Sequence, residues 1–175
     1  MIFEMKQTTV YKIPFKGLKL GKHQFNYLIE KEFFESYPYD EFIKTAINIV
    51  VDFNKKETIF ELHFVMQGTV RINCDVSGEE FDQPVKSTYD LIVNFGNEYN
   101  NENDQILTIP HNEYELDISQ YIYEMVILSV PTKRIHPGVL DGTLKSKALD
   151  KLEELQNKKE QIDPRWEKLK GLIED

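Results

Sequence analysis

Two residues capable of acid–base chemistry lie close together in an alternating segment of the chain. Glu61 and His63 are separated by one residue, in a stretch where apolar residues occupy every second position. Residues spaced by two in a β-strand point to the same side of the sheet, and here that is the polar side. A carboxylate and an imidazole on one face can share a proton or hold a ligand, although most such pairs are simply solvated. The sequence therefore offers Glu61 and His63 as a possible polar site and assigns no catalytic residue.

Other signals for cofactor or metal chemistry are weak. Cys74 is the single cysteine, which excludes an internal disulfide and a multi-cysteine zinc site. Cys74 also falls on the apolar side of its strand, where cysteine acts as a small hydrophobic residue. The four histidines are not at helical ligand spacing, and no glycine-rich phosphate loop or metalloprotease motif occurs. We therefore expect no cofactor and no bound metal.

Charge is distributed unevenly along the chain. The net charge is −9, but residues 1–22 carry +4, residues 23–131 carry −14 and residues 132–175 carry +1. An acidic body repels a phosphate backbone, which argues against DNA and favours a basic partner. No apolar run approaches the roughly 18–20 residues of a membrane span. The N-terminus shows no secretory signal. We expect a cytoplasmic protein that does not contact a membrane.

Three segments alternate apolar and polar residues with a period of two, the pattern of half-buried β-strands. They span residues 47–53, 60–76 and 85–95. Polar residues 54–57 favour a hairpin between the first two, and Ser77-Gly78 marks a turn before the third. Because one face of each strand is polar, the pattern favours an antiparallel sheet with one wet face.

The strand phase also predicts a core and an irregularity. Gly68 lies in the middle of the second segment, where we expect a bulge, a bend or a turn. Shorter strands are expected at residues 11–15 and 25–29. The residues predicted to be buried are Leu62, Phe64, Val70, Ile72, Cys74, Tyr89, Leu91 and Val93.

Helices are expected on either side of these strands. Apolar residues recur at spacings of three and four from residue 118 to 130, which predicts one helix, with Asp117 or Ser119 as its N-cap. A short helix is expected at residues 32–37. Residues 145–161 have high helix propensity but a thin apolar stripe. The segment Asn97–Asp104 is expected to be a mobile loop.

The predicted fold class is α+β. We expect a twisted, mostly antiparallel β-sheet or partial barrel with a packed helix and a C-terminal helical tail. In this organisation residues 1–131 form the β body, including helix 118–130. Residues 132–144 form a linker, and residues 145–175 form the helical tail.

Several motifs in the second half of the chain occur in a recognisable order. Residues 70–77 read VRINCDVS, residues 114–118 read YELDI, residues 127–131 read ILSVP, and residues 163–169 read DPRWEKL. Over about residues 60–175 this series resembles the YceD-like large ribosomal RNA subunit accumulation proteins. The resemblance implies a partner-binding role for the terminal motif. Its residues are Asp163, Pro164, Arg165, Trp166 and Leu169.

The chain departs from the family pattern at its cysteines. Where the family has a CxRC-type motif, only Cys74 is present, with Val76 in the place of the arginine and Ser77 in the place of the second cysteine. The loop at residues 132–137 also lacks a cysteine. A metal site formed by cysteines in other members cannot form here.

The resemblance implies a non-enzymatic ribosome-biogenesis factor that promotes accumulation of large-subunit ribosomal RNA. We favour an acidic body that holds a basic ribosomal protein, since charge complementarity selects partners. Alternatively, the basic N-terminal arm, with Lys133 and Arg134 and the cluster from Arg165 to Lys170, contacts precursor RNA. The terminal motif either docks on the chain's own body or contacts the partner. The rival hypothesis is a small ligand-binding or hydrolytic β-barrel protein with a site near His63 and Glu61. The sequence does not indicate an oligomeric state.

Overall fold

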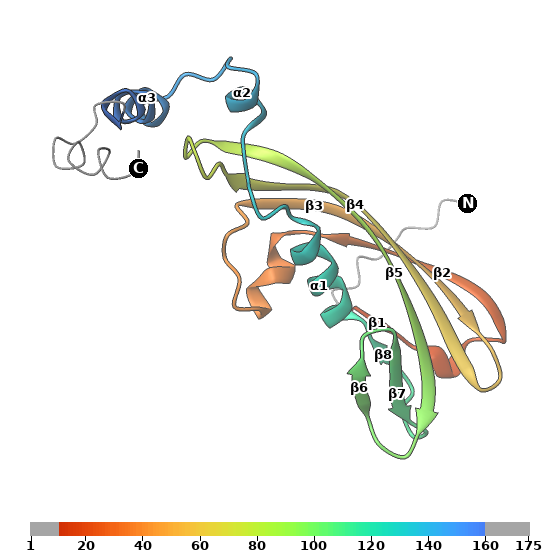
Figure 1. The fold of residues 1–175 in the computed structure, drawn as a ribbon. Helices are drawn as coiled ribbons and strands as arrows, with labels where there is room; N and C mark the ends of the chain where they lie inside the picture. Colours follow the sequence, from red (N-terminus) through yellow and green to blue (C-terminus); the bar gives the residue numbers. More distant parts are fainter. Residues whose placement is uncertain (1–10, 160–175) are drawn as a thin grey trace, which may run out of the picture. The chain divides into compact units, whose positions relative to one another are not determined.

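The computed structural model describes residues 11–159 of the chain, with the side chains of residues 156–159 left out (Figure 1). The terminal motif at residues 163–169 therefore lies outside the described residues. The described chain forms two compact units. The first contains residues 11–72 and 82–132, and the second contains residues 73–81 and 133–159. Each unit is described by itself below.

The first unit is built on an open six-stranded sheet with the strand order β2-β3-β4-β5-β7-β6. The pairs β2–β3, β3–β4 and β6–β7 are antiparallel, whereas β5 and β7 are parallel. The strands are β2 (Gly21–Ile29), β3 (Lys44–Lys55), β4 (Ile59–Asn73), β5 (Glu80–Gly96), β6 (Asn100–Asn103) and β7 (Ile106–Pro110). The sheet does not close into a barrel, because β2 and β6 stand at its two edges.

Smaller elements flank this sheet. Strands β1 (Lys12–Ile13) and β8 (Leu116–Asp117) form a separate antiparallel pair. The 3₁₀-helices η1 (Phe15–Gly17) and η2 (Lys31–Ser36) precede and follow β2. Helix α1 (Ser119–Ser129) begins two residues after β8. The predicted α+β class, with a mostly antiparallel sheet and a packed helix near residues 118–130, is confirmed.

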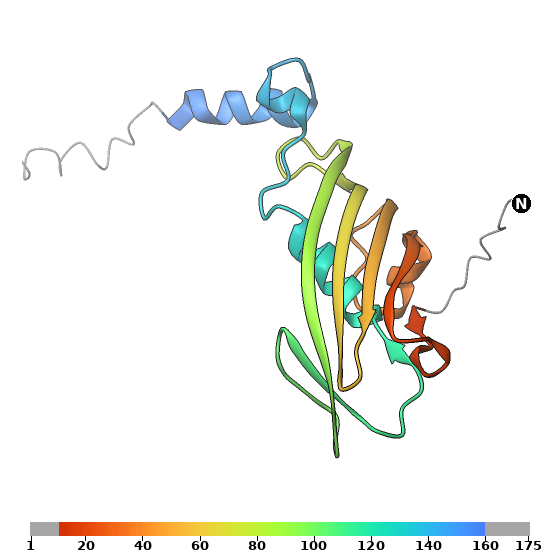
Figure 2. The same ribbon diagram turned by 90° about the vertical axis from the view of Figure 1, so that its right-hand side faces the viewer.

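One face of the sheet is apolar and buried, and the other is polar. Along β3 and β4 every second side chain is buried, because the period of two in the sequence sends these residues to one side. Helix α1 lies across the apolar face with η2 beside it (Figure 1). The helix buries Ile122, Met125 and Val126. No helix of the first unit covers the other face (Figure 2), so that face is the wet one.

Gly68 does not interrupt β4, contrary to the expectation of a bulge, bend or turn. The antiparallel register with β3 runs without a shift from Lys44 opposite Arg71 to Lys55 opposite Phe60. A Cβ atom at Gly68 would lie 2.3 Å from the carbonyl oxygen of Ala46. The glycine is therefore needed for close approach of the two backbones, a role that leaves the strand intact.

Three further expectations are corrected. Tyr89 is only half-buried; its ring stacks on Tyr121 with centroids 5.8 Å apart. The loop predicted at residues 97–104 contains β6, which pairs with β7. The strand predicted at residues 11–15 is reduced to β1, since Phe15 already belongs to η1. The other residues predicted to be buried are buried: Leu62, Phe64, Val70, Ile72, Cys74, Leu91 and Val93.

The second unit joins the turn after β4 to the chain beyond α1. Gly78 in this turn has φ of +73°, a conformation that favours glycine. Helix α2 (Pro137–Leu140) lies in the segment predicted as a linker, and α3 (Lys147–Lys159) follows. Among the described residues, no helix is long and apolar enough to cross a membrane.

We expect Gly68→Ala to lower the free energy of unfolding by about 1–3 kcal/mol, because the added methyl group has to displace the β3 backbone. Gly17→Ala is the matched control, since a Cβ atom there meets nothing within 4 Å. Urea denaturation of the three proteins measures the difference. Equal stability of the two variants would contradict the close approach of β3 and β4.

Candidate functional site

Glu61 and His63 share the polar face of the sheet, as predicted, but bind different neighbours. Glu61 pairs with Lys56 and accepts a hydrogen bond of 3.0 Å from the Asn54 side chain. Bonding to Lys56 and Asn54 holds the pKa of the Glu61 carboxyl below its ordinary value. The Nδ1 atom of His63 lies 2.5 Å from Oδ1 of Asp90 on β5. The structure therefore gives each residue of the predicted pair its own partner and shows no contact between them.

The polar face forms a row of contacts across four strands. Gln24 on β2 donates to Asp52 on β3 at 2.8 Å, and Asp52 stands opposite His63 on β4. His63 in turn contacts Asp90 on β5. Sequence reasoning missed Asp52 and Asp90, because neither lies near His63 along the chain and only the strand register brings them together.

At one end of the same face, Arg71 and Asp82 form a two-point ion pair. The Arg71 Nε and Nη2 atoms each donate to an Asp82 carboxylate oxygen at 2.9 Å. This hydrogen bonding, with the positive charge of Arg71, holds the pKa of Asp82 below its ordinary value. A shallow depression of about 110 Å³ lies beside the pair, and its lining includes Lys44 and Thr69. The depression does not reach Glu61 or His63, so it does not support a ligand site there.

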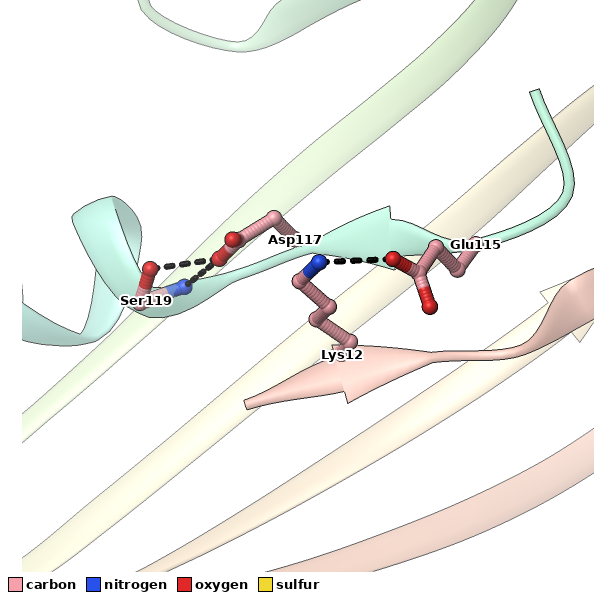
Figure 3. A network of polar contacts seen from close by, with 4 residues as sticks. All are labelled: Lys12, Glu115, Asp117 and Ser119. Carbon is pink, nitrogen blue, oxygen red and sulfur yellow. Dashed lines mark hydrogen bonds and ion pairs between the residues drawn. The ribbon is translucent and has the colours of Figure 1, made fainter. Parts of the chain in front are cut away.

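A second polar network fixes the start of α1 (Figure 3). Lys12 on β1 pairs with Glu115 at 2.6 Å, just before β8. Asp117 accepts hydrogen bonds from the backbone N–H and the hydroxyl of Ser119. The prediction of Asp117 or Ser119 as the N-cap is wrong, because Ile118 occupies that position; Asp117 instead bonds to the first residue of the helix from the position before the cap. The network ties the first strand to the helix that covers the core.

The helix side of the first unit holds pairs of tyrosines that the sequence analysis did not single out. Tyr37 and Tyr123 stack with ring centroids 4.1 Å apart and planes 7° apart. Tyr89 and Tyr121 stack at 5.8 Å. The spacing of Tyr121 and Tyr123 on α1 carries the signal, because residues two apart lie about 200° apart around a helix. They therefore lie on opposite sides of α1, with the exposed residues Gln120 and Glu124 between them.

In the second unit the sulfur of Cys74 accepts hydrogen bonds from backbone N–H groups. The donors are Ser77 at 3.4 Å and His136 at 3.2 Å. Burial raises the pKa of the thiol, but these donors outweigh burial, so the pKa of Cys74 lies below its ordinary value. The sulfur is an acceptor that joins the turn to the segment near His136.

The groups around Cys74 do not fit a metal ion. The Ser77 hydroxyl accepts the N–H of Glu79 at 3.3 Å, and the Nδ1 atom of His136 accepts the N–H of Gly138 at 2.9 Å. These lone pairs are directed at backbone donors. In the part of the chain that the structure describes, no group of three or more His, Cys, Asp or Glu side chains is placed to hold a metal ion.

Lys133 and Arg134, the residues predicted to contact RNA, lie at the start of the same segment. The backbone of Arg134 pairs twice with Asp75: its N–H donates to the Asp75 carboxylate and its carbonyl accepts the Asp75 N–H, both at 2.8 Å. Lys133 is exposed. The backbone of this segment is therefore fixed by Asp75, and the Lys133 side chain faces solvent. The remaining predicted site residues, Asp163 to Leu169, lie outside the described chain.

Comparison with known proteins gives one match. The family model described as Large ribosomal RNA subunit accumulation protein YceD matches residues 62–173, which is more than half of the chain. No curated protein and no solved structure matches the chain.

We expect His136→Pro to raise the pKa of the Cys74 thiol. His136 has φ of −57°, which proline can adopt; the substitution removes the N–H donor, and the sulfur has to move away from the ring carbon that replaces the hydrogen. His136→Ala is the control, because it removes the imidazole and keeps the N–H. Ultraviolet titration of the thiolate measures the change, with no other cysteine in the chain to interfere. Identical titration of the two variants would contradict the hydrogen bond.

Proposed function

The chain belongs to the YceD family of large ribosomal RNA subunit accumulation proteins, and from this membership we propose that it promotes the accumulation of large-subunit ribosomal RNA as a non-enzymatic assembly factor. The family match over residues 62–173 is the observation that carries the proposal. In this role the chain binds a large-subunit ribosomal protein in the cytoplasm. The bound ribosomal protein stays competent to assemble, and once it joins the large-subunit RNA it protects that RNA from degradation.

The charge of the chain supports a basic protein as the direct partner. The net charge is −9, and large-subunit ribosomal RNA presents a phosphate backbone that this charge repels. A lysine- and arginine-rich protein is attracted by the same charge, which raises the association rate and selects the partner. Precursor RNA, contacted through Lys133 and Arg134, is the second candidate, because Lys133 is exposed beside the fixed backbone of Arg134.

The alternative of a ligand-binding or hydrolytic protein has less support. The sheet is open rather than closed into a barrel. Glu61 and His63 bind separate neighbours on an exposed strand face. Acid–base chemistry requires groups that converge on one reacting atom, and these two diverge to Lys56 and Asp90.

We expect loss of this chain from its host to lower the ratio of large-subunit to small-subunit ribosomal RNA. The expected cause is degradation of large-subunit RNA that lacks a bound protein. Quantification of both RNAs in a deletion strain, with and without a plasmid copy of the wild-type sequence, measures the effect. An unchanged ratio in the deletion strain would overturn the proposed function.

The terminal motif is proposed to contact the assembly partner. Truncation after Gln161 removes Asp163, Pro164, Arg165, Trp166 and Leu169. We expect the truncated chain to keep its melting temperature and to lose co-sedimentation with large-subunit precursors on sucrose gradients. A melting temperature lowered by several degrees would instead show that the motif is part of the chain's own core.

A further inference from the structure

The exposed side of α1 is a ridge with an apolar end. The ridge is formed by Gln120, Glu124 and Leu128, which are four residues apart and lie on one side of the helix opposite its buried side chains. Leu128 is 84% exposed, more than any other large apolar side chain of the described residues. An apolar side chain at this exposure gains stability only when a second surface covers it.

Tyrosine rings flank the ridge on both sides. Tyr123 stacks on Tyr37 of the segment after η2, and Tyr121 stacks on Tyr89 of β5. All four residues are half-buried, so each keeps part of its surface in solvent. Tyrosine is enriched at protein interfaces, where its ring supplies apolar contact and its hydroxyl supplies a hydrogen bond.

Carboxylates lie close to these tyrosines. Burial raises the pKa of Tyr89, and the charges of Asp104 and Glu124 raise it further. The pKa of Tyr11, whose ring meets Phe33 of η2, is raised by burial and then by Glu30 and Glu32. Within the described chain none of these four carboxylates forms an ion pair. The helix side therefore presents negative charge that the described residues do not neutralise.

The polar face of the sheet differs from the helix side in this respect. There Glu61 pairs with Lys56, Asp82 with Arg71, and Asp90 contacts His63. Glu61 and Asp82 are thus paired with permanent cations, whereas among the described residues Asp52 accepts only from Gln24. Leu28 on this face is 43% exposed, against 84% for Leu128. The helix side is distinguished by its half-buried tyrosine pairs beside Glu124 and by the greater exposure of Leu128.

We propose that the α1 ridge and its flanking tyrosines bind an arginine- and lysine-rich segment of a large-subunit ribosomal protein. The proposal rests on the proposed function and locates its binding surface. A guanidinium group stacks on a tyrosine face and pairs with a nearby carboxylate, and the methylene stem of such a side chain covers Leu128. Phosphate groups of RNA do not fit, because the ridge offers them carboxylates instead of cations.

The test compares two variants with equal changes in charge, each of which also replaces one exposed apolar side chain by serine. The first is Glu124→Lys with Leu128→Ser, on the ridge. The second is Asp90→Lys with Val65→Ser, on the polar face of the sheet, where Val65 is 37% exposed. Each full-length protein is immobilised and exposed to a panel of individually purified large-subunit ribosomal proteins. Surface plasmon resonance gives the affinities, and thermal melts establish that both variants are folded.

At least one panel member is expected to bind the wild-type chain, and the ridge variant is expected to weaken that binding about thirtyfold or more. The sheet-face variant is expected to change it less than about threefold. Equal loss in both variants would show general charge attraction, which overturns the ridge and leaves the proposed function standing. If no panel member binds, both the ridge and the protein-binding form of the function are overturned.

Two further measurements cover other occupants of the ridge. In the first, a large-subunit precursor RNA is used in place of the protein panel. If the chain binds this RNA and only the ridge variant weakens the binding, the proposal is overturned. Sedimentation of the chain alone is the other. A wild-type dimer that the ridge variant converts to a monomer would assign the ridge to a second copy of the chain and would equally overturn it.

Discussion

The uninterrupted register between β3 and β4 is the constraint on which the first unit depends. A slip of one residue would move every apolar side chain of the slipped strand to the solvent side, because the side-chain period of a strand is two. At Gly68 the backbone of β4 lies so close to the β3 backbone at Ala46 and Ile47 that there is no space for a Cβ atom. Once this register is fixed, the strands have one apolar face, and α1 has a surface on which to bury Ile122 and Val126.

The two sides of the unit then differ in chemistry, and the difference follows from strand pairing. On the polar face, carboxylates stand opposite partners on neighbouring strands, so Asp82 meets Arg71 and Asp90 meets His63. On the helix side, Glu30, Glu32, Asp104 and Glu124 come from the segment around η2, from the β6–β7 connection and from α1, and the described residues form no ion pair with them.

The sequence predicts those features that depend on local pattern. The alternation of β3, β4 and β5 and the helical spacing of α1 were sufficient for the fold class, because each element buries its own periodic face. The parallel pairing of β7 with β5 was not predictable, since residues 106–110 contain no signal that selects their neighbour. Gly68 was misread for a similar reason: a glycine in a strand is compatible with a bulge and with close approach, and only the register distinguishes them.

The candidate site shows the same division between local and long-range information. The spacing of Glu61 and His63 placed both on the polar face, yet their partners Lys56 and Asp90 come from the hairpin and from β5. Cys74 was correctly placed in the apolar interior, but its bond to the N–H of His136 spans 62 residues. Such contacts depend on the tertiary fold, which brings together residues that are far apart in the sequence. The described turn is joined to the segment near His136 by backbone N–H groups that donate to a single sulfur.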